Sequence, residues 1–299
     1  MSVGTPVLSM RGIGKSFTGV RALDDVSLDC HAGEVHAICG ENGAGKSTLM
    51  KVLGGVYRPD EGEVLLAGEP TAFKHPVEAR GAGISIIHQE LSLLPERSVA
   101  DNIFLGLEPT RGGLLDRAAM QAGARRLLER VGARVEPDAL VKSLSIAEQQ
   151  LVEIAKALAL DAQIIVMDEP TAALDERDAG RLLELVGTLR REGAAILYIS
   201  HRMAELKAIA DRITVLKDGK LVATQPAAAL TPAMIVRLMV GRDLADFFPP
   251  PGDPAKLGPV VLSVQGGGNA VLADIALDLR AGEIVGVAGL EGSGKGALG

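Results

Sequence analysis

Short strand-like runs and longer helix-like stretches alternate in the pattern of apolar and polar residues. Residues 7–40 carry short alternating runs such as VSLDC, which predict an antiparallel β-ribbon. Three later runs are continuously apolar: ISII at 84–87, IIVM at 164–167 and AILYIS at 195–200. Strands of this kind are buried on both faces, as in parallel sheets. The pattern therefore predicts an α/β fold.

Helix-like spacing occupies much of the remaining chain. Between 114 and 160, apolar residues recur at intervals of three and four, which predicts a helical insertion. The same spacing runs from Leu182 to Leu189, and Gly193 is placed to end that helix. We expect this second segment to pack on the sheet as a crossover helix.

A proline-dense stretch, FFPPPGDPAKLGP, begins at residue 247 and predicts a linker over 247–258 that ends a first domain at 1–246. Beyond it, AGEIVGVAGLEGSGKGAL at 281–298 repeats AGEVHAICGENGAGKSTL at 32–49. We interpret 259–299 as the incomplete start of a second copy, in a piece of a longer duplicated protein. About 40 residues are too few to bury a core alone.

Composition narrows the function classes. The chain has 299 residues, 47% of them hydrophobic, and a net charge of -7, with only 2% aromatic residues. A broadly basic surface and aromatic stacking platforms are therefore lacking, and we expect no nucleic-acid partner. No apolar run is long enough to span a membrane and the N-terminus does not resemble a signal peptide, which favours the cytoplasm. Cys30 and Cys39 lack metal-site spacing and suit a reducing compartment.

The stretch GENGAGKST is the strongest chemical signal. It follows a short apolar strand candidate and precedes a helix candidate, the context in which backbone N–H groups cradle phosphates. The alternative is a glycine-rich turn with a chance lysine. The candidate nucleotide-binding residues here are Gly40, Glu41, Asn42, Gly43, Ala44, Gly45, Lys46, Ser47 and Thr48.

Two acidic residues end the apolar strand at 164–167. Asp168 and Glu169 are adjacent, so their side chains point to opposite sides and must act differently. Asp168 is suited to the Mg²⁺ shell, and Glu169 to orienting or deprotonating an attacking water. A solvated acidic pair is the alternative.

A third string, LSIAEQQ at 144–150, places Ser145 at the start of a helical run. Its hydroxyl and the helix N-terminus together form an anion site. Taken alone, Ser145 would be an ordinary helix cap.

With these strings in this order, residues 5–246 resemble the ATP-binding cassette (ABC) ATPases. GENGAGKST corresponds to Walker A, Gln89 to the Q-loop, LSIAEQQ to the signature, IIVMDEP to Walker B, AALD to the D-loop and His201 to the switch histidine. The resemblance implies a P-loop NTPase fold with a mixed central sheet, an N-terminal antiparallel β-subdomain and a helical subdomain at about 91–160.

The resemblance also implies roles for individual residues. Phe17 would stack on adenine, and Lys46 would contact the β- and γ-phosphates. Mg²⁺ would be held by Ser47, Gln89 and Asp168. His201 would bond the γ-phosphate and assist Glu169, with Lys46 and Gln89, in catalysis. Ser145 and Asp175 would act across an interface between two cassettes. The structural alternatives are a ribbon-closing Phe17, a surface Gln89, a core histidine and a helix-capping Asp175.

Within the family, LSIAEQQ, GVYRPDEGEV and the second copy resemble the ATPase subunits of simple-sugar importers. This implies ATP hydrolysis on the cytoplasmic face of the membrane, driving sugar import through integral membrane permease subunits and a periplasmic or extracellular sugar-binding protein. A second cassette or a homodimer would complete the sites. Import of a nucleoside or other small polar solute, a soluble double-cassette factor and a non-hydrolytic nucleotide-gated module are the alternatives. Gly296 stands where the second P-loop would need a hydroxyl, so we expect weak nucleotide binding there.

Overall fold

The computed structural model describes residues 5–241, 257–289 and 293–298. The chain divides into two units, Met1–Leu244 and Ala245–Gly299. The predicted linker at 247–258 lies outside the described residues, apart from its last two positions. Among the helices of the described segments, none combines the length and the apolarity needed to span a membrane.

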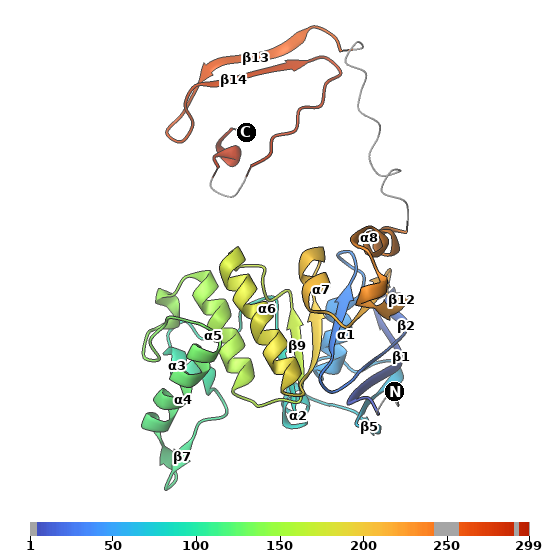
Figure 1. Ribbon diagram of the computed structural model, residues 1–299, viewed down its shortest axis with the longest axis vertical. Helices are drawn as coiled ribbons and strands as arrows, with labels where there is room; N and C mark the ends of the chain where they lie inside the picture. Colours follow the sequence, from blue (N-terminus) through green and yellow to red (C-terminus); the bar gives the residue numbers. More distant parts are fainter. Residues whose placement is uncertain (1–4, 242–256, 290–292, 299) are drawn as a thin grey trace. The chain divides into compact units, whose positions relative to one another are not determined.

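A six-stranded mixed sheet forms the centre of the first unit (Figure 1). Five strands are parallel, and the edge strand β12 runs antiparallel to β11. In spatial order the strands are β12 (Lys220–Pro226), β11 (Arg212–Lys217), β3 (Val35–Cys39), β10 (Ala195–Ile199), β9 (Ile164–Asp168) and β6 (Ile84–Ile87). Every residue of β3, β9 and β10 is buried, which the continuous apolar runs predicted for β9 and β10. In β6, the third such run, three of the four residues are buried.

The two faces of this sheet belong to different hydrophobic clusters. Along β10, Ile196 and Tyr198 join the cluster that includes Leu182 and Val186 of α6 (Glu176–Arg191). The alternate residues of β10 join a cluster with Leu49 of α1 (Lys46–Leu53). Helix α6 connects the parallel strands β9 and β10, so the predicted crossover is confirmed. The remaining helices of the core are α2 (Pro76–Gly81), α7 (Met203–Ile209), α8 (Pro232–Val240) and a 3₁₀ turn at Ala227–Ala229.

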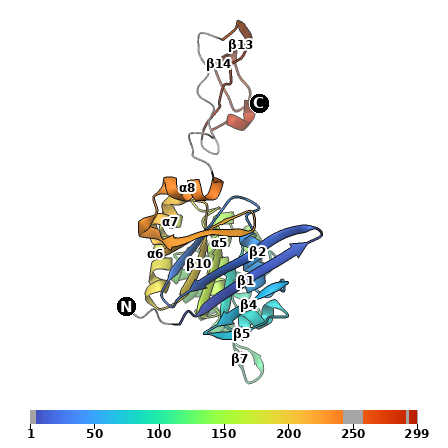
Figure 2. The same cartoon turned by 90° about the vertical axis from the view of Figure 1, so that its right-hand side faces the viewer.

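An antiparallel sheet packs against the α1 face (Figure 2). It contains, in spatial order, β2 (Val20–Cys30), β1 (Leu8–Phe17), β4 (Glu61–Leu66) and β5 (Glu69–Thr71). Alternate residues of β1 and β2 point into the cluster shared with α1. The predicted N-terminal antiparallel β-subdomain and the α/β fold are therefore confirmed.

The insertion between β6 and β9 contains several helical segments. They are α3 (Val99–Ile103), α4 (Arg117–Arg130), a 3₁₀ turn at Val141–Ser143 and α5 (Ile146–Leu158). The prediction of helical structure from residue 114 is wrong at its start, because β8 (Leu114–Leu115) pairs with β7 (Thr110–Arg111) in a short hairpin. Gly112 and Gly113 both have positive φ, and this turn conformation stops a helix from extending through them.

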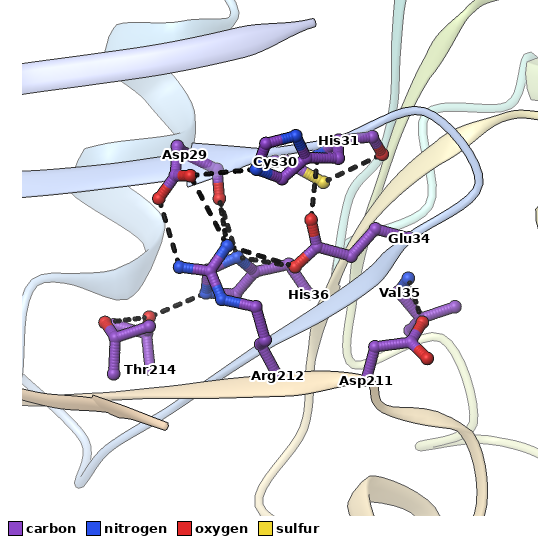
Figure 3. A network of polar contacts seen from close by, with 10 residues as sticks. Asp29, Cys30, His31, Glu34, Val35, His36, Asp211, Arg212 and Thr214 are labelled. Atoms are coloured by element: carbon purple, nitrogen blue, oxygen red, sulfur yellow. Dashed lines mark hydrogen bonds and ion pairs between the residues drawn. The ribbon is translucent and has the colours of Figure 1, made fainter. Parts of the chain in front are cut away.

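A partly buried polar network joins the β2–β3 connection to β11 (Figure 3). The Arg212 guanidinium contacts Asp29 at 3.1 Å and Glu34 at 3.3 Å. His36 is fully buried, with Nδ1 2.8 Å from the Asp29 carbonyl and Nε2 2.7 Å from the Thr214 hydroxyl. Because Nδ1 faces a carbonyl oxygen, it carries the proton of a neutral ring, and Nε2 accepts from Thr214. The network ties the two sheets together through a neutral histidine.

In the second unit, β13 (Val260–Gly267) pairs with β14 (Ile275–Arg280), and a 3₁₀ turn covers Lys295–Ala297. None of its described residues is buried. Residues 284–288, the counterpart of β3 in the repeat, form no strand, and Ile284 is 98% exposed. The predicted second P-loop includes residues 290–292, which lie outside the described residues.

Candidate functional site

The glycine-rich loop lies between the carboxyl end of β3 and the start of α1. Gly45 has φ +100°, a left-handed conformation that disfavours other residues. A Cβ at Gly40 would lie 2.3 Å from the Leu216 carbonyl oxygen, so the loop approaches β11 more closely than a side chain permits. The loop therefore requires glycine at both positions, at Gly45 for its backbone conformation and at Gly40 for its contact with β11.

Lys46 is the first residue of α1 and is only 8% exposed. Its ammonium donates to the Gly40 carbonyl at 2.8 Å and to the Glu41 carbonyl at 3.0 Å. The charge is therefore held inside the curve of the loop, where a phosphate oxygen would replace these carbonyls as its partner.

The loop opens into a cavity of about 880 Å³. Sequence-predicted residues from separate strands line this cavity together. They are the loop and helix-start residues Gly40, Glu41, Asn42, Gly43, Ala44, Gly45, Lys46, Ser47 and Thr48, with Gln89, Asp168, Glu169 and His201.

Asp168 ends β9 within reach of the start of α1. The Ser47 hydroxyl donates to its Oδ2 at 3.4 Å. Burial, followed by the neighbouring charge of Glu169, raises the pKa of the Asp168 carboxyl. A cation at this position would compensate the buried charge.

Glu169 has a different set of partners. Its Oε1 lies 3.0 Å from His201 Nδ1, and its Oε2 accepts from Gln89 Nε2 at 3.4 Å. Its backbone is left-handed, with φ +48°, and its N–H donates to the Ile199 carbonyl at 3.0 Å. This turn directs the Glu169 carboxylate towards the ends of β6 and β10, whereas Asp168 faces α1.

Phe17, Ser145 and Asp175 do not line this cavity. The Phe17 ring packs edge-on against Tyr57, with the centroids 5.0 Å apart. Ser145 forms a capping box with Glu148 at the start of α5, and Asp175 caps α6. Within one chain these three residues have structural contacts, and their contacts with a nucleotide stay predictions.

Two cavity residues were not identified from the sequence. Ala22 of β2 and Met239 of α8 both line the space above the loop. Ala22 is a small apolar residue with no chemical signal, so nothing in the sequence marked it as part of the cavity. Met239 lies almost 200 residues from the loop, and nothing local in the sequence connects the two.

The donor set suits a magnesium ion that also binds phosphate. Ser47, Asp168 and Gln89 all offer oxygen atoms, which Mg²⁺ prefers. Within residues 5–241, 257–289 and 293–298, no group of three or more His, Cys, Asp or Glu side chains is arranged to hold a metal. A magnesium ion at Ser47 and Asp168 would be bound by one carboxylate, a hydroxyl and substrate phosphates.

Residues 23–172 match the profile of the ABC transporter family. The chain is 52% identical over 291 residues to ribose import ATP-binding protein RbsA 3 of Rubrobacter xylanophilus, covering 97% of this chain and 58% of that protein. It is 48% identical over 295 residues to a putative ribose/galactose/methyl galactoside import ATP-binding protein of Agrobacterium fabrum, covering 97% of this chain and 57% of that protein. The chain therefore spans a little more than half the length of these relatives.

Solved cassettes share the fold. One ATP-binding cassette of an ABC transporter has a TM-score of 0.69 and 28% identity, covering 78% of this chain and 98% of the cassette. Another, a dimeric cassette in a post-hydrolysis state with ADP and phosphate bound, has a TM-score of 0.67 and 26% identity, covering 75% of this chain and all of the cassette.

Proposed function

The chain belongs to the ABC transporter family, and from this premise we propose that its first unit binds and hydrolyses ATP. One observation carries the proposal: the ends of β3, β6, β9 and β10 bring Lys46, Gln89, Glu169 and His201 to a single cavity. Residues with these chemistries are what phosphoryl transfer to water requires.

In this proposal the loop N–H groups and Lys46 hold the triphosphate. Lys46 exchanges its carbonyl partners for oxygens of the β- and γ-phosphates, so its charge is fixed before the substrate arrives. Glu169 orients the attacking water and accepts its proton. His201, whose Nδ1 lies 3.0 Å from Glu169 Oε1, bonds the γ-phosphate, and Gln89, which donates to Glu169 Oε2, helps to hold the same water.

Ser47, Asp168 and Gln89 are the residues that would hold Mg²⁺. The bound ion would supply positive charge to the phosphate oxygens as negative charge shifts during transfer. The contact between the Ser47 hydroxyl and the buried Asp168 carboxylate, which brings two of these residues together, supports this assignment.

Ser145 and Asp175 point to a site completed by a second cassette. Neither residue lines the cavity of its own chain. We propose that two cassettes close head to tail, so that each signature helix presents its N-terminus to the nucleotide held by the other. The partner is the second cassette of a longer chain or another copy of this one.

We assign the hydrolysis to import of a simple sugar. The similarity to ribose and galactose import proteins supports this substrate class. The proposed partners are integral membrane permease subunits and, through them, a periplasmic or extracellular sugar-binding protein. The chain would then act as a peripheral subunit on the cytoplasmic face. A nucleoside or another small polar solute is the second candidate, because the residues that select the solute lie in the partner proteins.

The test is ATP turnover by the 299-residue chain as a function of its own concentration. We expect activity to rise faster than linearly and to disappear in Glu169→Gln, with ATP binding kept. Lys46→Ala should abolish binding, and Glu129→Gln, an exposed carboxylate of α4, should change neither property. Turnover that persists in Glu169→Gln, or ATP affinity that survives Lys46→Ala, would refute the assignment.

A second experiment tests the transport role. Purification of the chain from its own cells should retrieve an integral membrane subunit, and ribose should raise ATP turnover of that complex when the sugar-binding protein is present. Retrieval of ribosomes instead would support a soluble double-cassette factor.

A further inference from the structure

Glu205 lies in α7, outside the nucleotide cavity, and its carboxylate collects four hydrogen bonds. The residue is only 6% exposed. The donors are Thr171 Oγ1 at 2.7 Å, Tyr198 OH at 2.8 Å, Ser200 Oγ at 3.0 Å and an Arg202 guanidinium nitrogen at 3.4 Å. A single buried side chain thus accepts from four others.

Two of these donors lie next to residues that line the nucleotide cavity. Thr171 stands two residues after Glu169, and Ser200 directly precedes His201. The Ser200 hydroxyl also accepts from the Arg202 backbone at 3.0 Å, which fixes the turn that carries His201. One carboxylate therefore connects the loop after β9 to the loop after β10, and these two loops carry the Glu169–His201 contact of 3.0 Å.

The chemistry of the cluster requires a carboxylate. All four neighbours act as donors, and an ionised carboxylate accepts several bonds at once. Burial and the charge of Glu205 raise the pKa of Tyr198, so its phenol keeps the proton it donates. An amide of the same shape would turn an NH₂ group towards two of these partners, where a hydroxyl would have to rotate to accept from it and, on the Arg202 side, the guanidinium, which has no acceptor, would be left unpaired.

We propose that Glu205 is a positioning residue that holds Glu169 and His201 in mutual contact. Its relevance to catalysis rests on the proposed ATP hydrolysis, whereas its effect on the geometry of the pair does not. Glu205 accepts from Thr171 on one loop and from Ser200 on the other, and the backbone bond from Glu169 N–H to the Ile199 carbonyl also joins these two loops. Loss of the carboxylate should therefore remove the side-chain link between the loops and loosen the Glu169–His201 contact.

The test is Glu205→Gln in the 299-residue chain. Its matched control is Glu34→Gln, which replaces another buried carboxylate, 7% exposed, at the opposite end of the central sheet and bonded to Arg212. Three quantities are measured: kcat for ATP, the ATP dissociation constant, and the Cε1–H proton resonance of His201, identified by its loss in His201→Ala.

We expect kcat to fall by about tenfold or more in Glu205→Gln, since small displacements of catalytic groups have large effects on rate. ATP affinity should stay within about twofold, because Lys46 and the loop are untouched. The His201 resonance should move in Glu205→Gln and not in Glu34→Gln. If Glu205→Gln does not fold, Thr171→Val and Tyr198→Phe, which each remove one donor, are measured in the same way.

An unmoved His201 resonance overturns the proposal, whatever the turnover. A moved resonance with unchanged kcat also overturns it, because the contact would then have no catalytic consequence. If the wild-type chain and its membrane complex hydrolyse no ATP while the resonance moves, the proposed function fails and the positioning role stands.

Discussion

Acid should destabilise the first unit through a single buried histidine. His36 is fully buried and accepts a hydrogen bond from Thr214 at Nε2. Its surroundings contain the charged groups Asp29, Glu34 and Arg212 (Figure 3). Burial, and secondarily the charge of Arg212, lowers the pKa of His36 from 6.5 to about 4.

The sign of the effect follows from these two values. Below pH 6.5 the unfolded chain binds a proton at His36, whereas the folded chain binds it only near pH 4. The stability contributed by neutral His36 is therefore fully present above pH 6.5, and the free energy of unfolding decreases as the pH falls towards 4. A group with this shift loses about 2 kcal/mol between pH 7 and pH 5 and roughly 3 kcal/mol in total.

The assay is urea unfolding followed by far-ultraviolet circular dichroism at pH 7, 6 and 5. Asp29, with a lowered pKa, and Glu34, with a raised pKa, also bind protons as the pH falls. The informative quantity is therefore the difference in pH dependence between wild type and variant, not the pH dependence of the wild type alone. We expect His36→Gln to be less stable than wild type at pH 7 but to lose about 2 kcal/mol less on going to pH 5.

His75→Gln, which replaces an exposed histidine, serves as the control and should keep the wild-type pH dependence. Equal losses of stability in wild type and His36→Gln would refute the reasoning, because the acid sensitivity would then come from other groups.

Three further predictions concern the glycine-rich loop and α5, the helix that Ser145 caps. Gly40→Ala should lower the free energy of unfolding by about 1–3 kcal/mol, because the new Cβ would clash with the Leu216 carbonyl oxygen. Gly180→Ala is the control, since a Cβ there meets no atom within 4 Å. Equal effects of the two substitutions would contradict the clash. Ser47→Ala should raise the Mg²⁺ concentration needed for half-maximal ATP binding by about tenfold, or roughly 1.4 kcal/mol, and an unchanged requirement would remove Ser47 from the metal site. Ser145→Ala should cost about 1 kcal/mol by removing the α5 cap, measured by urea unfolding, and a stability equal to wild type would contradict the capping role.

Local sequence determined much of the fold and the centre of the site. The buried strands were readable because parallel strands covered on both faces are continuously apolar. The phosphate loop was readable because its glycines, its lysine and the helix that follows are consecutive in the chain, so their geometry is set by local backbone conformation. Leu114 and Leu115 of β8 were misread as the start of a helix because apolar spacing alone does not reveal the hairpin turn at Gly112 and Gly113 that pairs them with β7.

Tertiary structure decided which distant residues meet. Gln89 is 80 residues from Glu169 and His201 is 32 residues from it, and they touch because β6, β9 and β10 are neighbours in a parallel sheet. The four-donor cluster around Glu205 and the cavity position of Met239 depend equally on packing between separate elements.

The internal repeat separates the two contributions most clearly. Lys295 donates to the Gly289 carbonyl at 2.9 Å, as Lys46 does to Gly40 at 2.8 Å, so this local contact recurs with the sequence. The preceding segments are similar as well, yet Val35–Cys39 is a buried strand whereas residues 284–288 form none. A strand obtains its hydrogen bonds from other strands, and β3 has β10 and β11 on its two sides. The sequence of this segment allows it to form a strand, and its hydrogen bonds to β10 and β11 make it a strand in the folded protein.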